Sequence, residues 1–164
     1  MSDSAEDLLK KAGCNRGVIE HCRKVRESAR RYINPLSNPS LVEWGAMLHD
    51  IGRAKTHHID HGQVGADITR KFGIREEIAR IIECHVGAGL TADECTLLRL
   101  LPRDCVPRTV EEKIVAHADN MVNGTLICTL PTAVLSPFAL HRRVRRRLYS
   151  LALEMESCQD LSRI

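Results

Sequence analysis

Apolar residues recur along most of this chain at intervals of three and four positions, the spacing that places side chains on one face of an α-helix. Between residues 16 and 33, for example, such a stripe is formed by Val18, Cys22, Val25, Ala29 and Ile33. No segment shows a convincing alternation with a period of two, which a half-buried strand would require. The pattern therefore predicts an all-α fold.

Local signals divide the chain into a bundle of about six to eight helices. A short helix is expected over about 4–12, with Gly13 ending it, and a longer one over 16–33, stopped by Asn34–Pro35. Ser40 is expected to cap a third helix, which is apolar nearly all round and therefore central, and Gly52 is expected to end it. Further helices are expected over about 61–71, 75–86, 95–101, 109–122 and 137–159, and Thr109 with Glu112 resembles a capping box.

The composition fits a single domain over residues 1–164. Hydrophobic residues make up 43% of the 164, which is enough to form a core without stabilising disulfides or a structural metal. Only 3% of residues are aromatic, so the core must rest on aliphatic side chains, which suit helix packing. The formal net charge of +3 is mild and does not by itself indicate a nucleic-acid partner.

The cysteines and the N-terminus indicate a cytoplasmic protein. The seven cysteines are odd in number and form no C-x-x-C pair, which argues against a disulfide framework or a zinc ribbon. Free thiols in a reducing compartment are expected instead. The first residues lack the basic start and apolar run of a signal peptide, and no stretch approaches 18 consecutive apolar residues.

Five polar side chains fall on helix faces that should be apolar: His21, His49, Asp50, His85 and Asp119. A single histidine in such a place is usually a hydrogen-bonded core residue. An unpaired carboxylate in a core, however, is costly. A bound metal ion compensates inward-facing carboxylates and imidazoles together, and helix bundles build such sites from facing helices. The sequence therefore predicts a metal site in the core.

The order of these residues is similar to that of the HD superfamily of metal-dependent phosphohydrolases. Residues 49–53, HDIGR, resemble its HDIG variant. Residues 61–66, HGQVGA, resemble the HGxxGA element of two-metal HD enzymes, 85–89 the next histidine element, and 112–120 the closing E-K-I…A-D segment. The likeness covers about residues 15–123. It extends to small archaeal HDIG proteins and bacterial HD-type symmetrical dinucleoside tetraphosphate hydrolases, whereas the GYP segment of HD-GYP phosphodiesterases is missing.

The resemblance implies a ligand set for one or two divalent ions. His21, His49, Asp50 and Asp119 match the four ligands of the basic HD site, with Asp50 placed to bridge two metals. The additional histidines of the two-metal version are matched by His61 and His85. Such a mixed set suits Fe, Mn, Co or Ni better than Mg, which prefers oxygen. A metal-activated water would then attack phosphorus at a catalytic centre that includes Asp50.

One departure from the family concerns substrate binding. Many HD proteins carry Lys where this chain has Arg53, at a position that contacts a substrate phosphate. The resemblance therefore implies a catalytic and substrate-binding role for Arg53, whose flat donor set differs from that of Lys. Lys55 is a second candidate for binding substrate, and a solvated loop cation is the alternative for Arg53.

Other polar features are not assigned to the metal site. His57 and His58 are expected in an exposed loop, and His117 points about 200° away from Asp119 around a helix. No partner is evident for His141. The arginines of 142–147 fill the polar faces of an amphipathic helix whose apolar stripe is Leu140, Val144, Leu148, Leu151 and Met155. RNA binding there is possible but not favoured, because aromatic stacking residues are scarce, and this helix could instead mediate a homo-oligomer.

The expected function is hydrolysis of a phosphoester or phosphoanhydride in a small, nucleotide-like substrate. Three alternatives stay open: a cyclic phosphodiesterase at the same site, a di-iron oxygenase with a similar ligand set, and a regulatory module that binds a nucleotide without turnover. Degenerate HD domains usually lose ligands, and this chain keeps all six, which favours an enzyme. The loops 53–60 and 88–107 are expected to choose the substrate.

Overall fold

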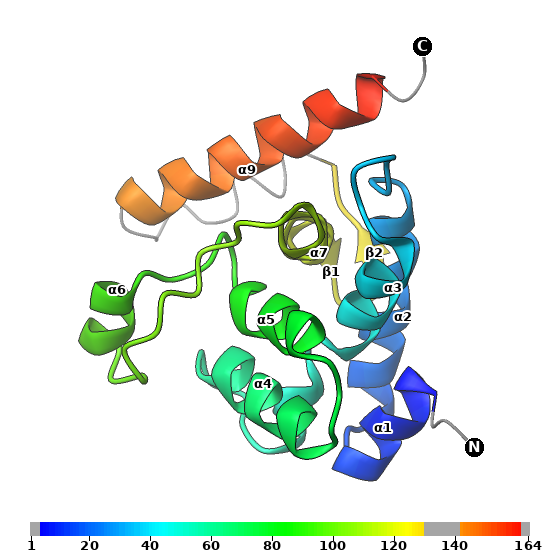
Figure 1. Cartoon of the computed structure of the whole chain (residues 1–164), viewed down its shortest axis with the longest axis vertical. Helices are drawn as coiled ribbons and strands as arrows, with labels where there is room; N and C mark the ends of the chain where they lie inside the picture. Colours follow the sequence, from blue (N-terminus) through cyan, green and yellow to red (C-terminus); the bar gives the residue numbers. More distant parts are fainter. Residues whose placement is uncertain (1–3, 130–141, 162–164) are drawn as a thin grey trace.

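The computed structural model describes residues 4–129 and 142–161, which form a helical bundle, as the sequence predicts (Figure 1). The helices are α1 Ala5–Ala12, α2 Arg16–Arg30, α3 Pro39–Leu48, α4 His61–Lys71, α5 Glu76–Cys84, α6 Ala92–Leu97, α7 Val110–Asn120 and α9 Arg142–Leu161. A 3-10 turn, η1, spans Ile51–Ala54. The only strands in the described ranges are β1 Val122–Asn123 and β2 Leu126–Ile127, an antiparallel pair in which Val122 lies opposite Ile127.

Several helix ends follow directly from capping residues. Ser4 and Asp7 form a capping box at α1, and Gly13 ends that helix in the left-handed conformation with a φ of 95°. The predicted capping box of Thr109 and Glu112 starts α7. Helix α4 has the predicted bounds, so its first residue, His61, is fixed at a helix start.

The predicted start and end of the central helix were wrong. Asn38, not Ser40, caps α3, and its side chain accepts hydrogen bonds from the backbone N–H groups of Ser40 and Leu41. Pro39 takes the first helical position, where its missing N–H costs nothing. The helix stops at Leu48 and η1 follows. In η1, Gly52 packs so closely on the His61 carbonyl that no Cβ would fit.

Other boundaries also differ from the sequence prediction. Helix α2 ends at Arg30, three residues early, because Arg31 and Tyr32 close the last turn with tighter i to i−3 hydrogen bonds. Helix α5 is shorter than predicted. Helix α6 begins at Ala92, where Thr91 and Glu94 form a capping box. The predicted start of the last helix, 137–141, lies outside the described residues.

The aliphatic core has two main clusters on either side of α3. One lies between α2, α3, α5, α7 and α9 and includes Val25, Ala46 and Ile114. The other joins α1 to α2, α3 and α5 through residues such as Leu9, Met47 and Ile82. Residues of α2, α3 and α5 contribute to both clusters. Close packing on both sides therefore restricts the movement of the side chains that lie between the two clusters.

Helix α9 docks on α7 through a polar cluster as well as its apolar stripe. Leu148, Leu151 and Met155 are buried as predicted, whereas Leu140 lies outside the described residues. The Tyr32 hydroxyl donates to Glu156 Oε1 at 2.7 Å, and His117 Nε2 lies 3.0 Å from the same oxygen. His117 is buried and faces α9, so its predicted orientation away from Asp119 is confirmed.

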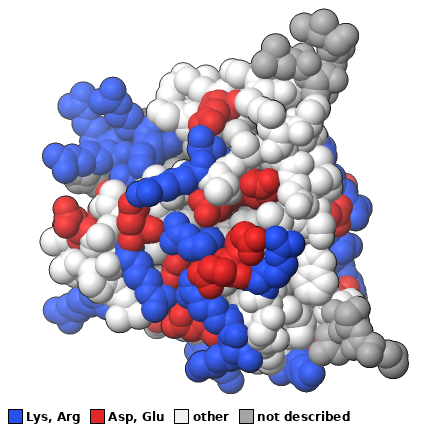
Figure 2. All heavy atoms as spheres, viewed as in Figure 1, with Lys and Arg blue, Asp and Glu red and all other residues white. Residues whose placement is uncertain are grey.

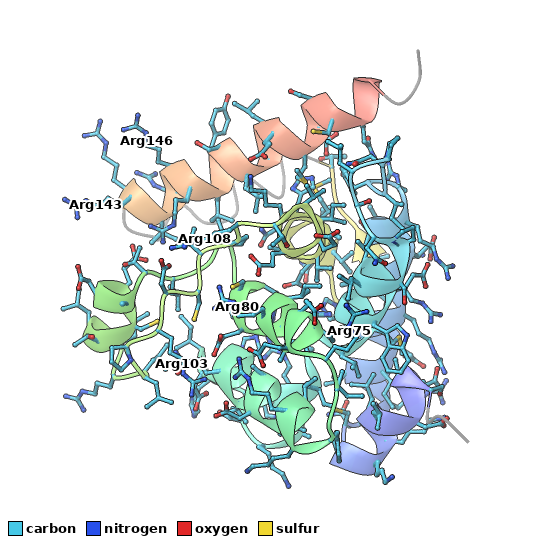
Figure 3. All side chains as sticks on the ribbon, in the orientation of Figure 1. Arg75, Arg80, Arg103, Arg108, Arg143 and Arg146 are labelled. Atoms are coloured by element: carbon cyan, nitrogen blue, oxygen red, sulfur yellow. The ribbon has the colours of Figure 1, made fainter. Side chains whose placement is uncertain are left out.

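The long segment 88–107 is tied to α4 and α5. The Gln63 amide donates to the Leu101 carbonyl at 2.8 Å and accepts from the Leu101 N–H at 3.1 Å. Buried Glu83 accepts from Arg80 at 3.0 Å and Arg103 at 2.7 Å (Figure 3). Among the described helices, none combines the length and the apolar character needed to cross a bilayer.

Candidate metal centre

Six side chains from separate elements converge in the middle of the bundle. They are His21 of α2, His49 and Asp50 just after α3, His61 at the start of α4, His85 just after α5, and Asp119 near the end of α7. All six are the residues singled out from the sequence. His49 and His85 are 0% and 1% exposed.

Asp50 lies between two pairs of histidines. Its Oδ2 atom is 3.9 Å from His21 Nε2 and 3.8 Å from His49 Nε2. Its Oδ1 atom is 3.4 Å from His61 Nε2 and 3.6 Å from His85 Nε2. Asp119 joins the first pair, with Oδ1 at 3.0 Å from His21 Nε2 and 3.4 Å from His49 Nε2. The six side chains thus form two adjoining groups that share Asp50.

Backbone carbonyls fix the orientation of all four histidine rings. Each Nδ1 atom lies 2.6–2.8 Å from a carbonyl oxygen, with the pairs His21–Gly124, His49–Ala46, His61–His58 and His85–Ile82. A carbonyl oxygen only accepts, so the Nδ1 atom carries the proton in each ring. In its neutral form each ring therefore turns an Nε2 lone pair toward the centre, the tautomer that a metal-ligating histidine needs.

The centre consequently has acceptors without matching donors. His61 Nε2 and His85 Nε2 are 3.1 Å apart, and His21 Nε2 faces a carboxylate oxygen at 3.0 Å. Within the described part of the chain, the buried His49 Nε2 and Asp50 Oδ1 have no hydrogen-bond partner. Buried polar atoms are rarely left so. The donor set therefore fits a divalent cation, and two overlapping groups, His21–His49–Asp119 and His49–Asp50–His85, are each compact enough to hold one. Because both groups use His49, a second ion beside the first would have to rely on Asp50, His61 and His85.

Electrostatics point to the same need for positive charge. Burial opposes ionisation of Asp119, but His49 and His21 hold its pKa well below the usual range. Burial likewise opposes ionisation of Asp50, whose pKa His49 and His85 lower. Although burial favours neutral His49, Cys22, Asp119 and Asp50 raise its pKa well above the ordinary value. The protonated ring of His49 supplies positive charge to the two carboxylates, and a bound cation would supply it instead.

The pKa of His61 is shifted in the opposite direction to that of His49. Burial and the neighbouring His85 lower the pKa of His61 to about 4. His61 is therefore neutral at physiological pH, and its Nε2 lone pair is available without loss of a proton. This is the protonation state that a metal ligand requires.

Arg53 lies at the edge of the centre. Its Nε atom donates to Asp50 Oδ2 at 2.6 Å, and its Nη2 atom lies 3.5 Å from His61 Nε2. Lys55, two residues on, is exposed. His57 and His58 are also exposed, as predicted, and His141 lies outside the described residues.

Sequence reasoning missed the backbone groups that orient the rings. The carbonyl of Gly124 reaches His21 because the turn between β1 and β2 folds back onto α2. The carbonyl of His58 holds His61, so a loop residue interpreted as surface contributes to the centre through its main chain. The identity of a residue does not indicate where its backbone carbonyl will point. Only Gly124, a residue typical of turns, could have indicated that the chain folds back near His21.

Comparisons with known proteins place this geometry in a family. An uncharacterized protein of Methanocaldococcus jannaschii is 46% identical over 129 residues, which cover 75% of this chain and 76% of that protein. The tRNA (cytidine(56)-2'-O)-methyltransferase of Picrophilus torridus is 45% identical over 79% of this chain, but the match spans only 36% of the methyltransferase. Ribonuclease Y of Acidothermus cellulolyticus is 32% identical over 53% of this chain and 15% of its own length.

A solved structure has the same fold. The HD domain of the L. monocytogenes phosphodiesterase PgpH superposes with a TM-score of 0.57 at 17% sequence identity, covering 92% of this chain and 97% of that one. The model of the HD domain family matches residues 18–124, which contain all six convergent side chains. This chain therefore belongs to the HD domain family.

Proposed function

We propose that this chain is a metal-dependent phosphohydrolase in which six side chains hold one or two divalent ions. The proposed ligands are His21, His49, Asp50, His61, His85 and Asp119. The observation that carries the proposal is the position of Asp50, whose two oxygens face the Nε2 atoms of two separate histidine pairs. A single structural ion needs only one such group. Two groups that share a carboxylate suit a two-ion centre for phosphoryl chemistry.

The ligand set also favours particular metals. Four imidazoles and two carboxylates suit Fe, Mn, Co or Ni better than Mg. When bound, such ions supply Lewis acidity and ease the deprotonation of water. The fold contributes preorganisation, because four backbone carbonyls keep the imidazoles aimed at the centre before any ion arrives.

Arg53 is proposed to bind the substrate phosphate at the rim. Its guanidinium has five N–H donors in a planar fork, of which Nε already holds Asp50. The same fork is suited to two oxygens of one phosphoryl group. The hydrogen bond to Asp50 fixes the position of the Arg53 side chain relative to the centre. A group that positions a scissile phosphate must be held in this way. Lys55 is proposed as a second, more exposed contact.

The proposed substrate is a phosphoester or phosphoanhydride in a nucleotide or RNA. Relatives that are named tRNA methyltransferases and ribonuclease Y support this class. A second candidate is a non-catalytic nucleotide-binding module. The methyltransferases favour it, because a segment that makes up about a third of such an enzyme could serve only to bind.

Metal analysis combined with a substrate screen tests the proposal. Protein purified without chelators is analysed by plasma mass spectrometry and assayed with Mn²⁺ or Fe²⁺ against phosphomonoesters, phosphodiesters and nucleotides. One or two Fe or Mn ions per chain with turnover is the expected result. Metal without turnover on any substrate favours the binding module. Absence of metal after reconstitution contradicts both the ligand assignment and the hydrolase.

A further inference from the structure

Arg53 places a positive charge inside the candidate metal centre. Its Nε atom donates to Asp50 Oδ2 at 2.6 Å, and its Nη2 atom lies 3.5 Å from His61 Nε2. The side chain of Arg53 is 31% exposed, whereas that of Asp50 is 5% exposed. The guanidinium is therefore partly withdrawn from water and contacts two of the proposed ligands.

The backbone holds Arg53 in this place. The Arg53 N–H donates to the Asp50 carbonyl at 2.9 Å, which closes the η1 turn. The neighbouring Gly52 packs directly on the His61 carbonyl, which keeps η1 beside the start of α4. The positive charge is therefore a fixed part of the centre, and only rotation of the Arg53 side chain could remove it.

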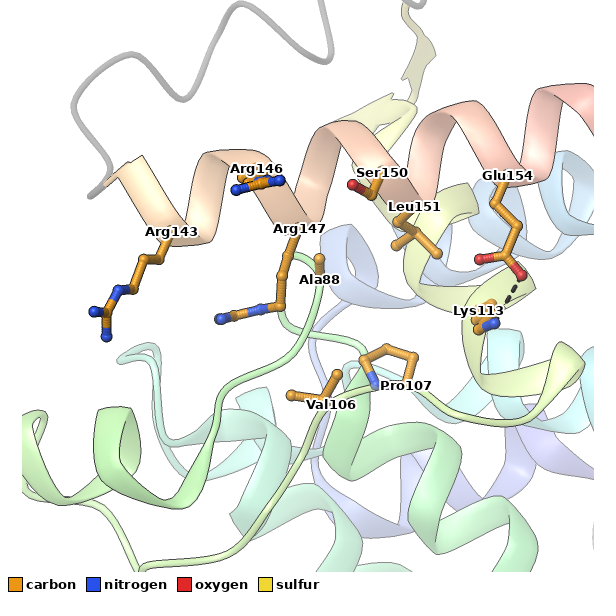
Figure 4. Close-up of a pocket in the computed structure, with 10 residues that line it drawn as sticks. All are labelled: Ala88, Val106, Pro107, Lys113, Arg143, Arg146, Arg147, Ser150, Leu151 and Glu154. Carbon is orange, nitrogen blue, oxygen red and sulfur yellow. Dashed lines mark hydrogen bonds and ion pairs between the residues drawn. The ribbon is translucent and has the colours of Figure 1, made fainter.

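Ion pairs elsewhere in the molecule use carboxylates that are not proposed ligands. Lysines and arginines lie beside acidic side chains over the middle of the face in Figure 2, and in the pocket between α7 and α9 Lys113 donates to Glu154 at 2.7 Å (Figure 4). Arg80 donates to Glu83, three residues on, at 3.0 Å. Such pairs offset two charges without involving the centre. Arg53 differs from them because its carboxylate partner is a proposed metal ligand.

The two proposed ion positions differ in the carboxylates that serve them. The position beside Asp119 has that carboxylate and also Asp50 Oδ2 nearby. Among the described residues, Asp50 is the only carboxylate with an ion-pair contact to His61 or His85, at 3.4 and 3.6 Å from its Oδ1 atom. Arg53 already offsets the charge of this carboxylate. The second position therefore offers a divalent ion little net negative charge.

Arg53 also repels an ion at the second position directly. A metal ion lies about 2 Å from a ligating imidazole nitrogen, so an ion on His61 would be within roughly 6 Å of Arg53 Nη2. Like charges repel more strongly in a partly buried centre than in bulk water, because the effective dielectric constant is lower. An ion beside Asp119 has two nearby carboxylates to offset the same repulsion. The first ion is therefore expected to bind more tightly than the second.

A phosphoryl dianion at Arg53 would reverse this effect. The Nε atom is committed to Asp50, but the contact of Nη2 with His61 exceeds the usual hydrogen-bond range of about 2.7–3.2 Å. The two terminal nitrogens can therefore donate to two oxygens of one phosphoryl group while Nε keeps its bond to Asp50. The negative charges of the dianion then offset Arg53 and attract a divalent ion to the second position.

We infer that Arg53 keeps the second ion position weak until a phosphoryl dianion binds beside it, so that the second ion and the substrate phosphate enter the centre together. The inference rests on the proposed function and adds how the same site is regulated. Because coupling between two binding sites is reciprocal, the second ion must in turn strengthen binding of the dianion. A centre of this kind completes its metal pair only on a phosphorylated substrate.

Titration calorimetry with Mn²⁺ on protein stripped of metal tests the inference without any turnover. Arg53→Gln removes the charge and Arg53→Lys keeps it. Arg80→Gln is the matched control, because Arg80 also pairs with a carboxylate three residues away and its side chain is similarly exposed. Electron paramagnetic resonance detects exchange-coupled Mn²⁺ pairs, and circular dichroism confirms that each variant is folded.

Each protein is titrated in chloride and in sulfate of equal ionic strength. Sulfate is a tetrahedral dianion that a phosphohydrolase does not cleave, and equal ionic strength keeps the screening of charges constant. In chloride, the wild type should bind the second Mn²⁺ at least about tenfold more weakly than the first, and Arg53→Gln should strengthen the second ion on the order of tenfold. Sulfate should strengthen the second ion about tenfold in the wild type but less than about threefold in Arg53→Gln.

The other two variants separate charge from packing. Arg53→Lys should keep the wild-type pattern, and Arg80→Gln should change neither affinity by more than about twofold. Equal second-ion affinity in Arg53→Gln and the wild type, or an equal sulfate effect in both, would overturn the inference. Tight binding of the second ion by Arg53→Lys would overturn it as well, because the charge would not be the cause.

The metal content separates failure of the inference from failure of the proposed function. Binding of one Mn²⁺ only, with and without sulfate, would overturn the inference and leave a one-ion hydrolase possible. Failure of every protein to bind Mn²⁺ would contradict the proposed function and the inference with it.

Discussion

The Nε2 atoms of His61 and His85 face each other across 3.1 Å, although the Nδ1–H of each ring already donates a hydrogen bond to a backbone carbonyl. Two nitrogen lone pairs at this distance repel each other unless a cation lies near both. Asp50 Oδ1, 3.4 and 3.6 Å away, adds a third acceptor to the same space. The fold therefore maintains an electron-rich position that positive charge stabilises.

Removing one member of this pair should affect one ion only. His61→Ala is expected to lower the metal content from about two ions per chain to about one. His21, His49 and Asp119 keep one group intact, and because His49 can ligate only one ion, the loss of His61 leaves the second ion with Asp50 and His85 alone. Plasma mass spectrometry after reconstitution with Mn²⁺ measures the change. His57→Ala, in the exposed loop, and His141→Ala serve as controls that should leave the content unchanged. An unchanged ratio in the His61 variant would remove His61 from the ligand set.

Replacing the shared carboxylate should affect both ions. Asp50→Ala is expected to abolish metal binding and hydrolysis together, because both histidine pairs face this residue. The far-ultraviolet circular dichroism should stay helical, since the two aliphatic clusters are untouched. Full metal content with full turnover in this variant would show that the centre lies elsewhere.

The contact between η1 and α4 leaves no room for a side chain at residue 52. A Cβ at Gly52 would overlap the carbonyl oxygen of His61, which is backbone and cannot rotate away. Gly52→Ala is therefore expected to lower the free energy of unfolding by about 1–3 kcal/mol, as overpacking does. Urea denaturation measures it. Gly17→Ala, in a helix with only the Asn15 side chain nearby, should be neutral or stabilising by up to about 1 kcal/mol.

Docking of α9 should depend on pH through Glu156. Burial raises the pKa of this carboxyl, but the hydrogen bonds from Tyr32 and His117 lower it below the ordinary value of 4.5. A group whose pKa is lower in the folded state stabilises the protein above its unfolded pKa, and that contribution fades as the pH falls. Glu156→Gln should therefore cost about 1.5–3 kcal/mol at pH 7 and progressively less below about pH 4.5.

Urea denaturation of wild type and variant between pH 7 and pH 3 measures this difference. Glu154→Gln is the matched control, since Glu154 lies on the same helix and pairs with Lys113 near the surface. It should change the free energy of unfolding by less than about 1 kcal/mol. A Glu156 effect that stays constant with pH would show that the carboxylate charge is not what docks α9.

Elements with strong local signals could be predicted from the sequence. The bounds of α4 and the capping box of α7 follow from residue types that act within one helical turn. The cap of α3 was predictable in principle, because Asn38 followed by Pro39 is a favoured helix start. The predicted cap was Ser40 instead. The capping box at Thr91 and Glu94 is a second signal that was overlooked.

The residues of the centre could be predicted from the sequence, but the hydrogen bonds that orient them could not. Carboxylates and histidines on apolar faces mark five of the six residues, because such side chains need compensation in a core. The sixth, His61, was expected only from the resemblance to the HD superfamily. The carbonyls that orient the rings depend on chain paths that residue types do not encode. The same holds for Arg53, whose contact with Asp50 arises from the tight η1 turn. The single-domain organisation, the homo-oligomer and the roles of individual ligands stay predictions.

The hydrogen bond from His21 to the Gly124 carbonyl joins residues 103 positions apart. Contacts of such sequence separation close large loops, so they form late when a chain folds. During synthesis, which releases the N-terminal end first, His21 has no orienting carbonyl until residue 124 has emerged. An ion captured by the complete ligand set would then clamp the early and late parts of the chain together. Metal uptake by this protein should accordingly report that the chain has folded at least as far as residue 124.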